Sequence, residues 1–272
     1  MDARFALEAE IHRYYAAGQE AARLEAPFSR WEKVRTLDIL GRFLPRPPAL
    51  ILDVGGAAGA YAFQLADMGY EVDLFDAVPL HIEQARERGA NGERVPRKFQ
   101  VADARAIPCE DGVAGAVLFF GPLYHLTERE DRLQAIREAH RALHNGGVLL
   151  AVAISRFASA LDGILRGFLR DPRFVPIVEQ DLKTGQHRNE TGNPEYFTTA
   201  FFHHPDELKM EMTEGGFRNP RLCAIEGPVW TVREPDTSEQ RERLMATARA
   251  IESEPALLGA SAHIMGIATK VE

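Results

Sequence analysis

Residues 51–61, "ILDVGGAAGAY", decide the fold that this sequence predicts. Four residues that suit a buried strand are followed directly by six small ones, three of them glycine. A loop of small residues between a strand and a helix lets the backbone approach a ligand closely, and it directs the N–H groups of the helix start toward that ligand. This stretch therefore predicts a ligand site at the end of a strand.

Three ligands suit such a loop: a nucleotide phosphate, a dinucleotide, or an adenosyl sulfonium. A phosphate-binding Walker loop ends in Lys followed by Ser or Thr, and this loop has no such ending. A dinucleotide loop reads G-x-G-x-x-G, whereas this chain has Gly55, Ala57 and Ala60 at those positions. The loop is therefore a poor match to a dinucleotide site. The residues at the ends of the later strands help to distinguish the remaining ligands.

Strand-like and helix-like segments alternate from residue 50 onward. Gly69 and Gly89 end two of the helices, and Pro79 suits the first turn of the second one. The alternation predicts an α/β fold, a doubly wound, Rossmann-like sheet of seven strands, six parallel and the last antiparallel, with helices on both faces. The strands are expected at residues 50–54, 71–76, 98–103, 113–121, 148–154, 221–227 and 263–270.

We expect a single domain over residues 1–272 with two helical caps. One cap is N-terminal, residues 1–46, and ends at a proline-rich stretch. The other is an insert at about residues 155–195, which is long for a crossover and contains the flexible-looking polar stretch "KTGQHRNETGNP". Both caps should cover the carboxyl ends of the strands, where open α/β sheets bind their ligands.

An acid and three small residues stand at alternate positions of the loop, as Asp53, Gly55, Ala57 and Gly59. They resemble the first motif of the class I S-adenosylmethionine-dependent methyltransferases, which reads acid, any residue, then Gly-x-Gly-x-Gly. Alanine stands here in place of the middle glycine and keeps the loop small. Further acids end the second and third predicted strands, as in that family, and the order of the strands fits it as well.

The resemblance implies S-adenosylmethionine as the cofactor and suggests which residues bind it. Asp76, at the end of the second strand, is expected to accept hydrogen bonds from both ribose hydroxyls, with Ala77 beside it. Asp103, at the end of the third strand, is expected to meet the adenine amino group, with Ala104 beside the ring. Asp53 either contacts the ligand or ties the loop backbone together.

The stretch "FFGPLYHL", residues 119–126, should lie on the acceptor side, because in this family the fourth strand ends beside the sulfonium. Phe120 is expected to flank the cofactor. His125 can exchange a proton near neutral pH, so we interpret it as a base or as a residue that orients the substrate. Tyr124 is the second catalytic candidate, through a hydrogen bond to the substrate. The alternative for both residues is packing over the sheet edge.

Two N-terminal residues complete the predicted site. Many relatives fold an N-terminal helix over the cofactor, and this resemblance implies that Tyr15 and Arg23 meet the carboxylate of the cofactor. The alternative is that both lie on a solvated helix face.

The composition limits which classes of partner the protein is expected to have. The 272 residues carry a formal net charge of −8 and a pI of about 5.7, which argues against a nucleic-acid partner because phosphate contacts usually need a basic face. Only two cysteines occur, and the neighbouring His203 and His204 would point to opposite faces of a strand, so no metal is expected. The longest apolar run, "VLLAVAI", is too short to span a membrane, and the N-terminus lacks a signal-peptide core. We therefore expect a cytoplasmic protein without a membrane partner.

The expected reaction is the transfer of a methyl group to a small-molecule acceptor, as in bacterial natural-product metabolism. Oxygen, nitrogen and carbon nucleophiles stay open, and either a monomer or a homodimer fits. One alternative is a Rossmann-type NAD(P)-dependent oxidoreductase, which would bind nicotinamide. The other is a non-catalytic S-adenosylmethionine-binding protein, which would lack an acceptor cavity under the insert.

Overall fold

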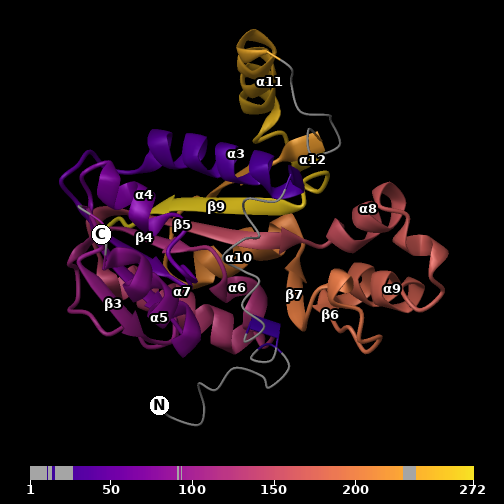
Figure 1. Ribbon diagram of the computed structural model, residues 1–272, viewed down its shortest axis with the longest axis horizontal. Helices are drawn as coiled ribbons and strands as arrows, with labels where there is room; N and C mark the ends of the chain where they lie inside the picture. Colours follow the sequence, from indigo (N-terminus) through magenta and orange to yellow (C-terminus); the bar gives the residue numbers. More distant parts are fainter. Residues whose placement is uncertain (1–10, 12–13, 16–26, 91, 93, 229–236) are drawn as a thin grey trace.

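The computed structural model describes residues 11, 14–15, 27–90, 92, 94–228 and 237–272 of the chain (Figure 1). Most of the predicted N-terminal cap, including Arg23, lies outside the described residues. The second half of that cap is the helix α3 (Pro27–Phe43).

A mixed sheet forms the centre of the described part of the chain (Figure 1). Strands β3, β2, β1, β4 and β5 lie side by side in that order and run parallel. Strand β9 pairs antiparallel with β5, and β8 pairs antiparallel with β9 at the edge. Six of these strands thus run one way and one runs the other, which confirms the predicted fold. Their bounds are β1 (Leu50–Val54), β2 (Glu71–Asp76), β3 (Lys98–Val101), β4 (Ala114–Phe119), β5 (Leu143–Ser155), β8 (Arg221–Ala224) and β9 (His263–Thr269).

Two short strands that the sequence did not predict as part of the sheet bring the described strands to nine. These are β6 (Gln186–His187) and β7 (Ala200–His203), which pair antiparallel. Strand β7 also runs parallel to the last residues of β5, and it lies next to the short helix α6 (Pro122–His125). The sheet therefore extends beyond the end of β4, on the side where ligands bind in such folds.

Helices cover both faces of the sheet because alternate residues of a strand point to opposite sides. Ile51 of β1 belongs to an apolar core shared with α3, α4 and α5, whereas Leu52 belongs to a second core shared with α7 and α10. Figure 1 shows α3 lying along the sheet. The bounds of the helices outside the insert are α4 (Ala62–Asp67), α5 (Pro79–Gly89), α7 (Arg129–Ala142), α10 (Pro205–Glu214), α11 (Ser238–Ile251) and α12 (Pro255–Leu258).

The chain between β5 and β7 forms the helical insert, which lies beyond the carboxyl end of β5 (Figure 1). Phe174, Ile177, Val178 and Tyr196 form a small apolar core within it. The insert therefore packs as a unit of its own on the strand-end side of the sheet. Its elements, apart from β6, are α8 (Ala158–Leu165), η2 (Phe168–Arg170), α9 (Val175–Thr184) and η3 (Pro194–Tyr196).

The polar stretch of the insert, residues 183–194, is held by side-chain contacts that its composition does not reveal. Both ring nitrogens of His187 lie 2.8 Å from an oxygen, one of the Asp181 carboxylate and one of the Tyr196 backbone. The Asn189 amide donates to the carbonyl groups of Asn193 and Phe197. These bonds tie the stretch to the rest of the insert, although its polar composition suggests a flexible loop.

Among the described helices, none combines the length and the apolar character that crossing a membrane requires.

Candidate functional site

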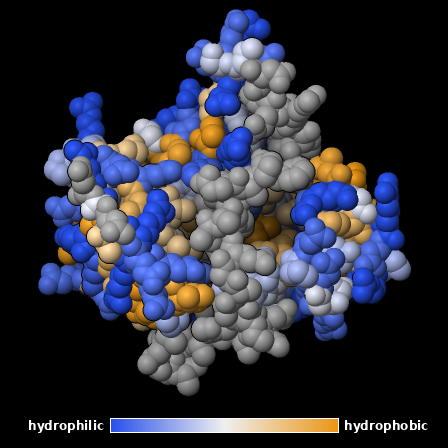
Figure 2. Space-filling view, viewed as in Figure 1, coloured by the Kyte–Doolittle hydropathy of each residue, from blue (hydrophilic) through white to orange (hydrophobic). Residues whose placement is uncertain are grey.

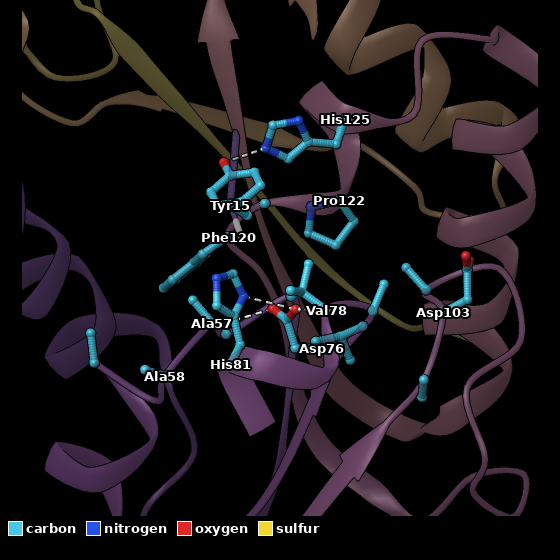
Figure 3. Close-up of a pocket in the computed structure, with 18 of the residues that line it drawn as sticks. Tyr15, Ala57, Ala58, Asp76, Val78, His81, Asp103, Phe120, Pro122 and His125 are labelled. Carbon is cyan, nitrogen blue, oxygen red and sulfur yellow. Dashed lines mark hydrogen bonds and ion pairs between the residues drawn. The ribbon is translucent and has the colours of Figure 1, made fainter. Parts of the chain in front are cut away.

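A cavity of about 460 Å³ lies at the carboxyl ends of β1, β2 and β4, and we call it the strand-end cavity (Figure 3). The loop after β1, the start of α5, the loop after β3 and helix α6 form its walls. This is the edge of an open α/β sheet where the fold places its ligand. The predicted site residues that line it are Tyr15, Gly55, Ala57, Asp76, Ala77, Asp103, Ala104, Phe120, Tyr124 and His125.

The loop after β1 needs small residues for two separate reasons. Gly55, Ala57 and Gly59 have positive φ angles of 76°, 49° and 80°. A Cβ on Gly55 would also lie 2.7 Å from Cδ of Pro122, so a side chain there is excluded by space as well as by conformation. Ala57 adopts the left-handed conformation despite its Cβ, which costs about 1–2 kcal/mol. The alanine in the family motif is therefore accommodated, but under backbone strain.

Asp53 lies behind this loop and is not part of the cavity wall. Its Oδ2 is only 2.5 Å from where a Cβ on Gly56 would be. Burial, reinforced by the charge of nearby Asp76, raises the pKa of Asp53 to about 7, although the backbone N–H of Ala62 opposes the shift. Because Asp53 is fully buried and does not line the cavity, its position favours support of the loop over direct contact with a ligand.

Asp76 is the most heavily bonded acid on the wall of the cavity. One carboxylate oxygen, Oδ2, accepts from the N–H of Ala57 at 2.8 Å. The other, Oδ1, accepts from the N–H of Val78 at 2.8 Å and lies 3.0 Å from Nδ1 of His81. The carboxylate is therefore fixed by backbone donors from the two loops that it joins.

Three residues of α5 line the cavity although the sequence analysis did not select them: His81, Gln84 and Arg88. The strand pattern points to the residue at the end of β2 and not to the helix that follows it. The three residues are three and four positions apart and therefore share one helix face, a spacing that is visible in the sequence.

Asp103 lines the cavity but is already engaged by Arg105. The Arg105 guanidinium donates to both carboxylate oxygens, at 2.9 and 2.8 Å, and the Arg105 backbone N–H donates to one of them at 2.8 Å. Arg105 also pairs with Asp131 at 2.8 Å. Bidentate pairs of this kind fix a carboxylate precisely, so Asp103 reaches any ligand in one orientation only.

Tyr15 and His125, predicted for different roles, meet in the structure. The Tyr15 hydroxyl lies 2.6 Å from Nε2 of His125, and their rings pack edge to face (Figure 3). The hydroxyl of Tyr124 donates to the backbone oxygen of Phe120 at 3.1 Å, so that group stabilises the end of β4. Phe120 itself packs edge-on against Tyr61 on the cavity wall.

A second cavity, of about 350 Å³, lies between the sheet and the insert, and we call it the insert cavity. Figure 2 shows a hollow with an apolar floor beside the insert. Tyr15 and Tyr124 line this cavity as well as the strand-end cavity, so the two share a wall. Its lining includes the aromatic residues Tyr14, Tyr15, Tyr124, Phe168, Phe174, Tyr196, Phe197 and Phe202 and the charged or titratable residues Asp162, Arg166, His187, Glu195 and His263.

His263 belongs to a network at the edge of the insert cavity. Its Nδ1 lies 2.5 Å from Oε1 of Glu226, whose Oε2 accepts from Ser261 and from the His263 backbone. Glu32, Glu226 and His263 each have one possible metal-ligand atom, and these three atoms lie within 4.8 Å of one another. Both oxygens of Glu226 accept hydrogen bonds within this cluster.

The other histidines considered as metal ligands are separated. His203 is fully buried and lies 3.2 Å from Glu211, whereas His204 accepts from the backbone of Asp206 at the start of α10. His203 is the last residue of β7 and His204 the first position before α10, so the two side chains have different partners.

Comparison with known proteins shows that the region around the loop is similar to methyltransferases. The family described as "Methyltransferase domain" matches residues 51–147. The malonyl-[acyl-carrier protein] O-methyltransferase of Geobacter sulfurreducens is 31% identical over 63% of this chain and 57% of its own length. A bovine relative named "Probable tRNA methyltransferase 9B" is 28% identical over 61% of this chain and 34% of its own length. The chain thus spans only about a third to just over half of these two relatives.

The fold has solved counterparts. The structure of an S-adenosylmethionine-dependent methyltransferase from Methanosarcina mazei superimposes with a TM-score of 0.58 at 18% identity, covering 86% of this chain and 97% of the other. At this identity the likeness concerns the fold.

Fold, loop and strand-end acids together define a Rossmann-like α/β protein with a ligand site at the carboxyl edge of its sheet. Residues 51–147 match the methyltransferase domain, and the chain is similar to class I S-adenosylmethionine-dependent methyltransferases in sequence and fold. S-adenosylmethionine is the cofactor of this class, and the residues present fit it. The small residues of the loop line the cavity, and the carboxylates of Asp76 and Asp103, each fixed by hydrogen bonds, line it as well.

Proposed function

We propose that this protein transfers a methyl group from S-adenosylmethionine to a small molecule bound in the insert cavity. The observation that carries the proposal is the shared wall: Tyr15 and Tyr124 line both cavities. Direct transfer requires donor and acceptor to be aligned at a single point of contact. Two cavities that meet at one wall provide such a point.

The cofactor brings an already activated methyl group on its sulfonium, so the protein mainly binds, aligns and excludes water. We propose that Asp76 accepts a ribose hydroxyl, with Ala77 beside it. Asp103, held by its arginine, accepts from the adenine amino group, with Ala104 beside the ring. Phe120 flanks the cofactor from the end of β4. All five line the strand-end cavity, which supports these roles.

For an acceptor that must lose a proton, we propose that the Tyr15–His125 pair takes it. Tyr15 lines both cavities, whereas His125 lines the strand-end cavity. The acceptor's proton passes to the Tyr15 oxygen while the hydroxyl proton of Tyr15 passes to Nε2 of His125, 2.6 Å away. The acceptor atom then forms its bond to the methyl group as the bond from sulfur breaks. The ring of Tyr124 covers this point, and its hydroxyl stays with the Phe120 carbonyl.

The lining of the insert cavity supports an apolar or aromatic acceptor, because many of its side chains are aromatic. The net charge of −8 speaks against a nucleic-acid acceptor. We also propose a role in natural-product metabolism for a single domain in which the insert at about residues 155–195 borders the acceptor. Of the alternatives, a nicotinamide-dependent oxidoreductase finds no support in the family match, and a protein that only binds the cofactor would not need the insert cavity.

Calorimetry with S-adenosylhomocysteine and with NADH tests the cofactor half of the proposal. We expect one site per chain for S-adenosylhomocysteine with a Kd in the micromolar range, or about −8 kcal/mol, and no heat with NADH. No heat and no thermal shift with millimolar S-adenosylhomocysteine would contradict it.

Methyl transfer from labelled S-adenosylmethionine tests the acceptor half. The arms are a panel of aromatic phenols, amines and acids, an acyl carrier protein loaded with malonyl, and transfer RNA. Label appearing only on small molecules supports the proposal, whereas label on RNA or on the carrier-bound acyl group would assign another acceptor.

A further inference from the structure

His81 is a buried polar residue of the strand-end cavity for which the proposed function has no role yet. Its side chain is 3% exposed, and its Nδ1 lies 3.0 Å from Oδ1 of Asp76. The other ring nitrogen, Nε2, is buried and has no hydrogen-bond partner among the described residues. A buried nitrogen of this kind lowers stability unless a ligand or water bonds it, so it points to a group that arrives with the ligand.

The number of hydrogen bonds that the Asp76 carboxylate can accept limits how many ribose hydroxyls it can bind. A carboxylate offers about four lone-pair positions, two on each oxygen. Oδ1 is bonded to the N–H of Val78 and to His81, and Oδ2 accepts from the N–H of Ala57. One position is left, on Oδ2. The ribose of the cofactor has two neighbouring hydroxyls, and Asp76 therefore has room for only one of them as a donor.

We infer that Asp76 and His81 divide the two ribose hydroxyls, with Oδ2 of Asp76 accepting one and Nε2 of His81 accepting the other. This inference rests on the proposed function, because it assumes that the ribose lies against Asp76. Figure 3 shows the two side chains next to each other on the cavity wall, joined by their hydrogen bond.

The protonation of the imidazole fits this role. A carboxylate only accepts, so Nδ1 of His81 carries the proton that faces Asp76, and in the neutral ring Nε2 is then an acceptor. The ring of Tyr15 packs edge-on against the imidazole at 5.4 Å and holds it in place. A hydroxyl is a suitable donor to a nitrogen fixed in this way.

Two substitutions of His81 distinguish its two possible roles, which are to accept a ribose hydroxyl and to hold the Asp76 carboxylate in place. The amide of His81→Asn reaches as far as Nδ1 and can still donate to Asp76, but it leaves no atom at the position of Nε2. The longer side chain of His81→Gln can place its amide oxygen where Nε2 was. Glu83→Gln, on the exposed face of the same helix, is the matched control. Affinities are measured by calorimetry with S-adenosylhomocysteine and its 2′-deoxy and 3′-deoxy analogues.

We expect His81→Asn to weaken S-adenosylhomocysteine binding about three- to tenfold, the effect of one neutral hydrogen bond. For the analogue that lacks the hydroxyl bonded by His81, wild type and His81→Asn should bind nearly equally, and His81→Gln should recover much of the affinity for the full ligand. Equal binding of the full ligand by wild type and His81→Asn, or the same loss for all three ligands, would overturn the inference. If wild type binds none of them, the proposed function fails instead. Thermal unfolding confirms that each variant is folded.

Discussion

The strand-end cavity and the insert cavity touch, yet they are built in different ways. Apart from Ile11 and Tyr15, the lining of the strand-end cavity comes from residues 54–126, where consecutive strands end at one edge of the sheet. The insert cavity draws on residues as far apart as Tyr14 and His263. The first is made largely of loops and fixed acids, and the second largely of aromatic side chains. The difference teaches that the strand-end cavity follows from the order of the strands, whereas the insert cavity follows from the packing of distant segments.

The largest expected effect lies where the two cavities meet. In His125→Ala, turnover of an acceptor found in the labelled-methyl screen should fall about 10²–10⁴-fold, because a general base contributes that much. Affinity for S-adenosylhomocysteine should stay nearly unchanged. His125→Gln keeps a hydrogen bond and loses the base, so it should be almost as slow, and Tyr15→Phe should match it if the proton passes through that hydroxyl. A wild-type rate in His125→Ala would remove the residue from the mechanism.

The next largest effect concerns Asp53, the acid behind the loop, and the dependence of folding stability on pH. The native pKa of Asp53 is about 7, well above its value in an unfolded chain, so the native state binds the proton more tightly. Its contribution to stability is full below about pH 4 and is lost as the pH rises to about 7, on the order of 4 kcal/mol. Asp53→Asn should lack this loss.

Urea unfolding of wild type and Asp53→Asn between pH 5 and 8 measures that difference. Asp111→Asn, at an exposed carboxylate, is the control for substitution of an acid as such. Parallel pH profiles for wild type and Asp53→Asn would show that Asp53 does not titrate in this range.

A smaller effect tests whether the two cavities are independent. Asp76→Ala removes the proposed acceptor of a ribose hydroxyl and leaves two loop N–H groups without their partner. Affinity for S-adenosylhomocysteine should fall at least about tenfold, since a hydrogen bond to a charged group is worth about 1.5–3 kcal/mol. Phe168→Ala, in the insert cavity, should leave that affinity unchanged. Calorimetry on both variants gives the contrast, and an equal loss in both would mean that the cavities are coupled.

The smallest effect concerns the strained alanine in the loop. Ala57→Gly relieves the left-handed strain of about 1–2 kcal/mol. It also adds freedom to the unfolded chain, which costs about 0.4–1 kcal/mol. The free energy of unfolding should therefore rise by about 0.5–1 kcal/mol in urea titrations. Gly41→Ala, in the interior of α3 with open space around it, controls for a glycine–alanine exchange elsewhere. A loss of stability in Ala57→Gly would show that the loop is not strained at this position.

Much of the strand-end cavity could be predicted because its lining depends on residues that are close in sequence. The alternation of strands and helices determines a parallel sheet, and the last residue of each parallel strand has to reach the same edge. Asp76 and Asp103 could be chosen on this ground, and both line the cavity. The exact bonding could not be predicted: that Asp103 is tied to Arg105, or that Asp76 is shared with His81, depends on side-chain directions that the strand pattern does not specify.

The sequence by itself determined the fold class, the loop and the edge of the sheet where a ligand binds, since these follow from local periodicity and from residues without bulky side chains. Only the tertiary structure placed Asp53 behind the loop, paired Tyr15 with His125 across 110 positions, and closed the insert cavity with Phe197 and His263. The physical reason is that contacts between distant segments form where whole elements pack. Such packing depends on the shapes of many side chains at once, and no short pattern in the chain encodes it.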